Sequence, residues 1–215
     1  MNIRNTTAKE RMLKKVRQAL LQKSENPHPD LEDSHLYNEE TEPLDVTFAR
    51  ELNAVSGNFI YCDGEISVIE NLIAVVEALN IRKIHVWEPS LQQLLKHYGF
   101  PFLDNRMSFE DSEAGITSCE ALIARNGSIL ISNANMSGRT LSIYPPIHIV
   151  MAKASRIVMD IKHGLSLIRE RYGDKIPSMI SVVTGPSRTT CMANELMLGG
   201  HGPKGLYVFL IEDRF

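Results

Sequence analysis

Two glycine-containing turns near the C-terminus hold the residues best suited to bind a negatively charged ligand. The first is Gly185-Pro186-Ser187-Arg188-Thr189, which follows an apolar run and precedes a segment expected to be helical. A helix N-terminus offers free N–H groups and partial positive charge to anions. Ser187 and Thr189 add hydroxyl groups, and the Arg188 guanidinium suits a carboxylate or phosphate. This turn predicts an anion site at the carboxyl edge of the sheet, where open α/β folds place ligands; plain helix capping is the alternative.

The second turn is Gly199-Gly200-His201-Gly202-Pro203-Lys204-Gly205. A left-handed cap at Gly199 or Gly200 is expected to end the preceding helix. The imidazole of His201 could donate to an anion or move a proton near neutral pH; alternatively, it bonds a backbone carbonyl and fixes the turn. Gly200, His201 and Gly202 therefore join the first turn as predicted ligand-binding residues.

Two further side chains are candidates for chemistry. Glu120 is the single carboxylate of residues 115–128, a segment that suggests turns; it could be a nucleophile or base, or a solvated or capping residue. Glu120 and His201 are thus the catalytic candidates. His148 alternates with isoleucines in an expected strand, so its ring is predicted to face the other side, toward a polar cleft or water. The seven histidines show no spacing with acids that indicates a metal site.

Apolar periodicity predicts the elements that position these residues. Apolar runs indicate strands, and apolar residues at helical spacing indicate helices. Strands are expected at 58–62, 83–87, 128–132, 147–151, 179–183 and 206–211, and helices at 66–79, around 91–95, at 160–172 and at 190–198. The alternation predicts an α/β fold with a mainly parallel sheet flanked by helices.

The N-terminal part of the chain is set apart by its charge. Residues 1–23 carry seven Lys or Arg and one acid, and they predict an amphipathic helical arm with a capping box between Thr7 and Glu10. Residues 24–45 carry eight acids and no Lys or Arg, and they predict a mobile linker. The folded domain is expected over 46–215. The basic helix could pack on its own domain or dock on a partner.

Composition narrows the class of protein. The chain is 43% hydrophobic and 23% charged, with a net charge of −3, which is typical of one globular domain. The near-neutral body does not suggest a nucleic-acid binder. Without an apolar run of roughly 20 residues or a signal-like N-terminus, a cytoplasmic location is expected. Cys62, Cys119 and Cys191 lie far apart, which predicts buried thiols and no zinc or cluster ligands; Cys191 stands out because it follows the first turn.

The two turns carry a resemblance to a known family. Thr184-Gly185-Pro186-Ser187-Arg188-Thr189 and Leu198-Gly199-Gly200-His201-Gly202-Pro203 resemble the LUD-domain family, most closely its lactate-utilization protein C type. Residues 115–130 and 144–150 and the basic N-terminal helix look similar too. The resemblance implies a fold like the NagB/RpiA/CoA-transferase group. It also implies a role in oxidising L-lactate to pyruvate beside two iron–sulfur proteins, which would hold the clusters while this chain binds no cofactor directly.

The chain departs from the family pattern at three carboxylate positions. Family members carry Ala-Asp-Ile-Glu where residues 190–193 read Thr-Cys-Met-Ala, and Glu-Thr-Gly where residues 125–127 read Arg-Asn-Gly. Three hypotheses therefore stay open: a component of a lactate-oxidising complex; a stand-alone transferase-, isomerase- or ligase-like enzyme acting on a phosphorylated sugar, a CoA ester or a folate; and a ligand-binding regulator without catalysis. Self-association is also left open.

Overall fold

A computed structural model of the chain describes residues 7–21, 42–106, 109–135, 137, 140–190 and 196–213. Helix α1 (Ala8–Leu21) belongs to a separate unit from the domain that starts at Glu42. Its capping box is present as predicted: the Thr7 N–H donates to Glu10 Oε2 at 2.8 Å, and the Glu10 N–H donates to Thr7 Oγ1 at 3.2 Å. Most of the predicted linker lies outside the described residues.

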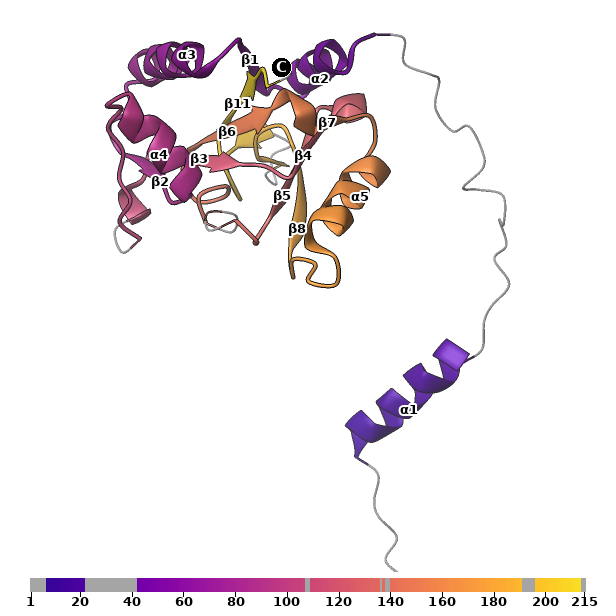
Figure 1. The fold of residues 1–215 in the computed structure, drawn as a ribbon. Helices are drawn as coiled ribbons and strands as arrows, with labels where there is room; N and C mark the ends of the chain where they lie inside the picture. Colours follow the sequence, from indigo (N-terminus) through magenta and orange to yellow (C-terminus); the bar gives the residue numbers. More distant parts are fainter. Residues whose placement is uncertain are drawn as a thin grey trace, which may run out of the picture. The chain divides into compact units, whose positions relative to one another are not determined.

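The core of the domain is a five-stranded parallel sheet in the order β1-β11-β6-β3-β2 (Figure 1). Its strands are β1 (Asn58–Cys62), β2 (Ile84–Val86), β3 (Ala114–Ser118), β6 (Ile147–Lys153) and β11 (Gly205–Ile211). Every pairing between them is parallel. The predicted α/β class with a mainly parallel sheet is confirmed.

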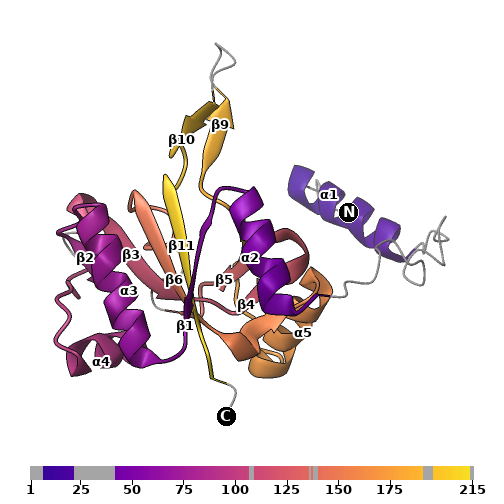
Figure 2. The same cartoon turned by 90° about the horizontal axis from the view of Figure 1, so that it is seen from above.

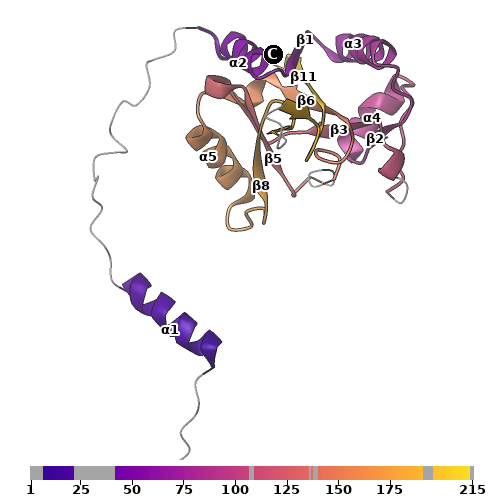
Figure 3. The ribbon, with the colours of Figure 1, turned by 180° about the vertical axis from the view of Figure 1, so that it is seen from behind.

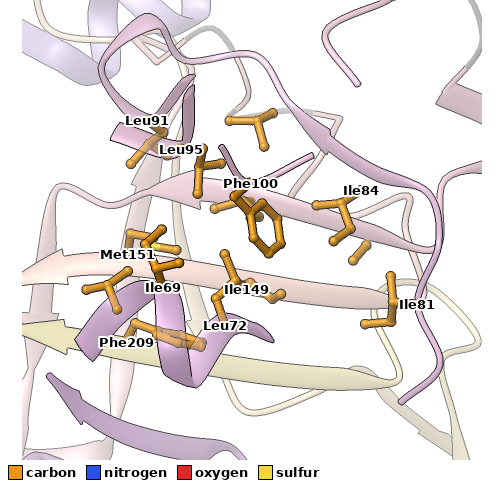
Figure 4. Packing of buried hydrophobic residues seen from close by; sticks show 14 of the residues in the cluster. Ile69, Leu72, Ile81, Ile84, Leu91, Leu95, Phe100, Ile149, Met151 and Phe209 are labelled. Carbon is orange, nitrogen blue, oxygen red and sulfur yellow. The ribbon is translucent and has the colours of Figure 1, made fainter. Parts of the chain in front are cut away.

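Different elements cover the two faces of this sheet (Figure 2). Because side chains alternate along a strand, Ile149 and Met151 of β6 pack toward α3 (Glu65–Ala78) and α4 (Pro89–His97), as Figure 4 shows. Val150 and its alternate neighbours on β6 pack toward α2 (Leu44–Ala54) on the other face. Both layers are apolar, so the central strands β3, β6 and β11 are buried on both sides.

A second, mixed sheet of four strands packs against that α2 face. Its order is β7-β4-β5-β8, with β5 antiparallel to both neighbours. Its strands are β7 (Ile157–Val158), β4 (Ala121–Ile123), β5 (Ser128–Ser132) and β8 (Ile180–Thr184), and α5 (Ile161–Tyr172) covers its outer side (Figure 3). Two strands expected in the parallel sheet, at 128–132 and 179–183, belong here instead. The turn-rich reading of 115–128 is wrong, because β3 and β4 occupy most of that segment as buried strands.

Short 3-10 helices complete the domain at Phe109–Asp111, Ala124–Asn126 and Ala154–Arg156, named η1, η2 and η3. Within the part of the chain that the structure describes, no helix is both long and apolar enough to cross a membrane.

The prediction of a helix over 190–198 is wrong. Residues Arg188–Thr190 form β9 and residues Leu196–Leu198 form β10, which pair as an antiparallel hairpin. The Gly199 N–H donates to the Ser187 carbonyl at 2.9 Å and closes the base of the hairpin. The β-branched Thr-Thr pair at 189–190 favours a strand. Residues 191–195, including Cys191, lie outside the described residues.

Candidate functional site

The structure brings the two sequence-predicted turns together. The Ser187 N–H donates to the Pro203 carbonyl at 2.9 Å, and the His201 N–H donates to Ser187 Oγ at 3.4 Å. Thr189 packs on Gly200, where an added Cβ would lie 2.7 Å from Thr189 Cγ2. A hollow of about 220 Å³ opens between the turns, and the predicted residues that line it are Gly185, Pro186, Ser187, His201 and Gly202.

This hollow does not have the geometry that the sequence suggested. It lies where β6 and β11 begin, since the Lys204 N–H donates to the Pro146 carbonyl at 2.7 Å, and so it is at the amino edge of the sheet. Arg188 is directed elsewhere: its Nη2 donates to the Val55 carbonyl at 2.8 Å and to Ser56 Oγ at 2.6 Å. The prediction of a helix N-terminus with a free guanidinium is therefore wrong, because a hairpin forms where the helix was expected.

A larger cleft, about 470 Å³, lies at the opposite edge of the parallel sheet. Residues at the carboxyl ends of β1, β3, β6 and β11 line it, namely Asp63, Ser118, Lys153 and Ile211. The first turns of α3 and α4 also reach it. In Figure 2 this edge is the end of the sheet away from the β9–β10 hairpin. The carboxyl edge is where open parallel sheets bind ligands.

The charges around this cleft have two signs. Arg156 from η3 and Lys153 from β6 line it, and Arg156 is half-buried. Asp213 accepts hydrogen bonds from the Ser155 N–H at 3.0 Å and from its hydroxyl at 2.7 Å. Burial acts to raise the pKa of Asp213, but these hydrogen bonds and the charges of Lys153 and Arg156 bring the pKa below its ordinary value. The remaining acids of the lining are Asp63, Glu65 and Glu212.

Glu120 is buried, so its prediction as a solvated or capping residue is wrong. Its Oε1 accepts hydrogen bonds from the Ser132 hydroxyl at 2.6 Å and the Tyr172 hydroxyl at 2.9 Å, and its Oε2 accepts from Arg171 Nη1 at 2.5 Å. Arg171 lines the carboxyl-edge cleft. Glu120 therefore fixes a cationic group at the cleft, and its catalytic role stays a prediction.

Sequence analysis missed a second buried carboxylate, Glu88. It accepts hydrogen bonds from the N–H and hydroxyl of Ser118 and from the Ser137 hydroxyl. Asn135 Nδ2 also donates to Ser118 Oγ, at 2.8 Å. The position of Glu88, two residues after the end of β2 and directly before Pro89, is a signal that could have marked it. No comparable signal marks the cations of the cleft.

His148 faces away from its isoleucine neighbours, as predicted, but it does not reach water. Its ring is fully buried, and its Nε2 lies 2.9 Å from Thr117 Oγ1. Burial lowers the pKa of His148 to about 3, so the ring is neutral. Within the described ranges, no group of three or more His, Cys, Asp or Glu side chains is placed to hold a metal ion.

Cys119 lines the cleft but is expected to be unreactive. Cys62 and Cys119 are both buried, as predicted. Burial raises the pKa of the Cys119 thiol to about 12, so only about one molecule in ten thousand carries the thiolate at pH 8. Iodoacetamide at pH 8 should leave Cys119 unmodified in the folded protein and alkylate it in urea, as read by peptide mass spectrometry. Rapid alkylation in the folded state would contradict this prediction.

The parallel sheet with a cleft at its carboxyl edge defines an open-sheet α/β protein. Residues 93–211 match the LUD domain, which is more than half of the chain. The chain therefore belongs to the LUD-domain family.

Named relatives and one solved structure agree with this assignment. Lactate utilization protein C of Bacillus licheniformis is 31% identical over 113 residues, 52% of this chain and 47% of that protein. The protein of the same name from Geobacillus sp. (strain WCH70) is 29% identical over 133 residues, 61% and 51% of the two chains. The chain thus spans about half the length of the curated relatives it matches. A DUF162 family protein from Deinococcus radiodurans shares the fold, with a TM-score of 0.57 and 19% identity over 78% of this chain and 96% of that one.

Proposed function

We propose that the chain is a component of a lactate-utilization system that oxidises L-lactate to pyruvate with iron–sulfur partner proteins. In this proposal it binds a small anionic ligand in the carboxyl-edge cleft. Its relatives named lactate utilization protein C support the system. The clusters belong to the partners, and the chain itself contributes a ligand site. The exposed basic helix α1 is a candidate for contact with those partners.

The observation that carries the ligand site is the guanidinium of Arg156. It is half-buried at the wall of the cleft, and none of the described residues forms a hydrogen bond or ion pair with it. A half-buried guanidinium that makes no hydrogen bond or ion pair with these residues, and only a longer-range interaction with Asp213, favours an anionic ligand, because guanidinium groups pair well with carboxylate and phosphate. Lys153 adds a second positive charge beside it.

The size of the cleft favours a second candidate. Its volume of about 470 Å³ falls within the roughly 300–1,000 Å³ of pockets that hold drug-sized ligands. Leu91, Leu94 and Met151 give it an apolar wall. A phosphorylated or CoA-type ligand, with an anionic end and a larger body, would fill the cleft better than lactate. A stand-alone enzyme acting on such a substrate is therefore the alternative function.

Replacing Arg156 by glutamine is expected to weaken anion binding at least about tenfold, which is typical for the loss of one hydrogen-bonded charge. Calorimetric titrations with L-lactate, pyruvate and pyrophosphate would measure this effect and separate a small carboxylate from a phosphate-bearing ligand. The matched control is Arg169→Gln, which removes an exposed arginine from α5. Equal anion affinity in the wild type and Arg156→Gln would refute the ligand site.

The partner proposal has its own experiment. The tagged full chain, isolated from cells growing on lactate, should retain proteins that show the visible absorbance of iron–sulfur clusters. Deleting α1 should weaken this retention if the helix makes the contact. Isolation of the chain without cluster-containing partners, from cells that do oxidise lactate, would contradict the assignment to a complex.

A further inference from the structure

The hollow at the amino edge differs in character from the cleft. Its volume is about 220 Å³, below the roughly 300–1,000 Å³ of pockets for drug-sized ligands. Its walls are mainly apolar, including Val183, Pro186 and Leu206. It shares no lining residue with the carboxyl-edge cleft. Only a small molecule with an apolar part fits such a space.

One residue of the lining carries a buried nitrogen atom that has no hydrogen-bond partner. His148 belongs to the lining, and its Nδ1 is buried and makes no hydrogen bond in the structure. Buried polar atoms in native proteins are nearly always paired, so an unpaired one requires an explanation. A ligand that enters the hollow would supply the missing partner.

The hydrogen bond of His148 to Thr117 determines what that partner must be. Both side chains are fully buried, and Nε2 lies 2.9 Å from Thr117 Oγ1. If Nε2 donated, the hydroxyl hydrogen of Thr117 would remain unpaired, because no other bond of this hydroxyl is present among the described residues. If the hydroxyl donates to Nε2, it is satisfied and the ring proton of the neutral imidazole lies on Nδ1. His148 then presents a donor, which requires an acceptor oxygen.

Ser187 offers a second donor at the same hollow. Its Oγ accepts the long bond from the His201 N–H, but its own hydroxyl proton has no acceptor among the described residues. Ser187 is half-buried in the lining, and His201, an exposed residue, lines the same hollow. Two donors and an imidazole around a small apolar space match the two oxygens and short carbon chain of a carboxylate.

We infer that the hollow binds a short-chain carboxylate of about two to four carbon atoms, whose oxygens accept hydrogen bonds from His148 Nδ1 and Ser187 Oγ. Its carbon chain would contact Val183 and Leu206. The occupancy of this site, at the end of the sheet away from the cleft, would depend on the concentration of a small acid such as lactate. It does not depend on the ligand of the cleft, so either site can fail without the other.

The test is a titration of the full chain with sodium acetate and sodium L-lactate. Both anions should bind to the wild type. The substitutions Ser187→Ala and His148→Leu should each raise the dissociation constant at least about tenfold. The cleft variant Arg156→Gln and the exposed serine variant Ser166→Ala should leave acetate binding unchanged. Acetate should also shift the Nδ1 proton signal of His148 in the NMR spectrum of the wild type.

Three results would overturn the inference. One is acetate affinity in Ser187→Ala equal to that of the wild type, which is informative even if His148→Leu does not fold. Another is equal binding of acetamide and acetate, which would show that the carboxylate is not recognised. The third is no binding of acetate or lactate to the wild type at millimolar concentration. Loss of acetate binding in Arg156→Gln alone would assign the carboxylate to the cleft and leave the proposed function standing.

Discussion

Replacing Glu120 by glutamine is expected to lower the free energy of unfolding by about 1–3 kcal/mol, the usual cost of leaving a buried hydrogen-bond donor without its acceptor. The side chain of Glu120 is 1% exposed and that of Arg171 is 31% exposed. Glutamine keeps the volume, so the loss does not come from a cavity. Its amide nitrogen would face one of the donors that now bind the carboxylate, and a buried donor without an acceptor is costly. Urea unfolding followed by circular dichroism measures the change.

The control for this prediction is an ion pair of the same residue types on the surface. Glu42 and Arg50 are each nearly half exposed, and exposed pairs contribute at most about 1 kcal/mol. Glu42→Gln should therefore leave the unfolding midpoint nearly unchanged. If Glu120→Gln and Glu42→Gln cost the same, Glu120 does not anchor α5 and Arg171 as the structure indicates.

Glu120 illustrates what sequence reasoning can and cannot reach. The sequence marks Glu120 as the single carboxylate of its segment, but its partners Arg171 and Tyr172 come from a helix about fifty positions later. No local pattern links them. The same holds for Arg156, which reaches the cleft because β6 ends there. Side-chain partners that are far apart in the chain require the fold before they can be named.

The elements that were predicted share a strong local signal. Strands β6 and β11 are buried on both faces and therefore appear as continuous apolar runs. Strand β3, Ala-Gly-Ile-Thr-Ser, is just as buried. Its small and polar residues are also common in turns, and they therefore led to the prediction of turns. The segment after Ser187 was assigned to a helix from its position in an alternating pattern, although Thr189 and Thr190 favour a strand.

Arg125 and Gly127, on the turn before β5, act through the contacts that they make. The Arg125 guanidinium binds Asp160 and holds the pKa of that carboxyl below its ordinary value. Both side chains of this ion pair are partly buried, so Arg125 connects the turn to the start of α5. Gly127 lies against α2 instead.

Replacing Gly127 by alanine is expected to lower the free energy of unfolding by about 2–5 kcal/mol. Its φ is +62°, a left-handed conformation that costs an L-residue about 1–2 kcal/mol. An added Cβ would also lie 2.3 Å from the Leu52 nitrogen and 2.5 Å from the Glu51 carbonyl carbon. These are backbone atoms of α2, so the clash can be relieved only by moving the helix, and overpacking costs a further 1–3 kcal/mol or so.

Gly99 provides the matched comparison for Gly127, because its φ is +70° but nothing lies within 4 Å of an added Cβ. Gly99→Ala should therefore show the backbone cost alone, about 1–2 kcal/mol. Urea unfolding of both variants separates conformational strain from close approach. A loss in Gly127→Ala no greater than in Gly99→Ala would mean that α2 can move away freely. In that case the contact between α2 and the turn before β5 would not require a glycine at this position.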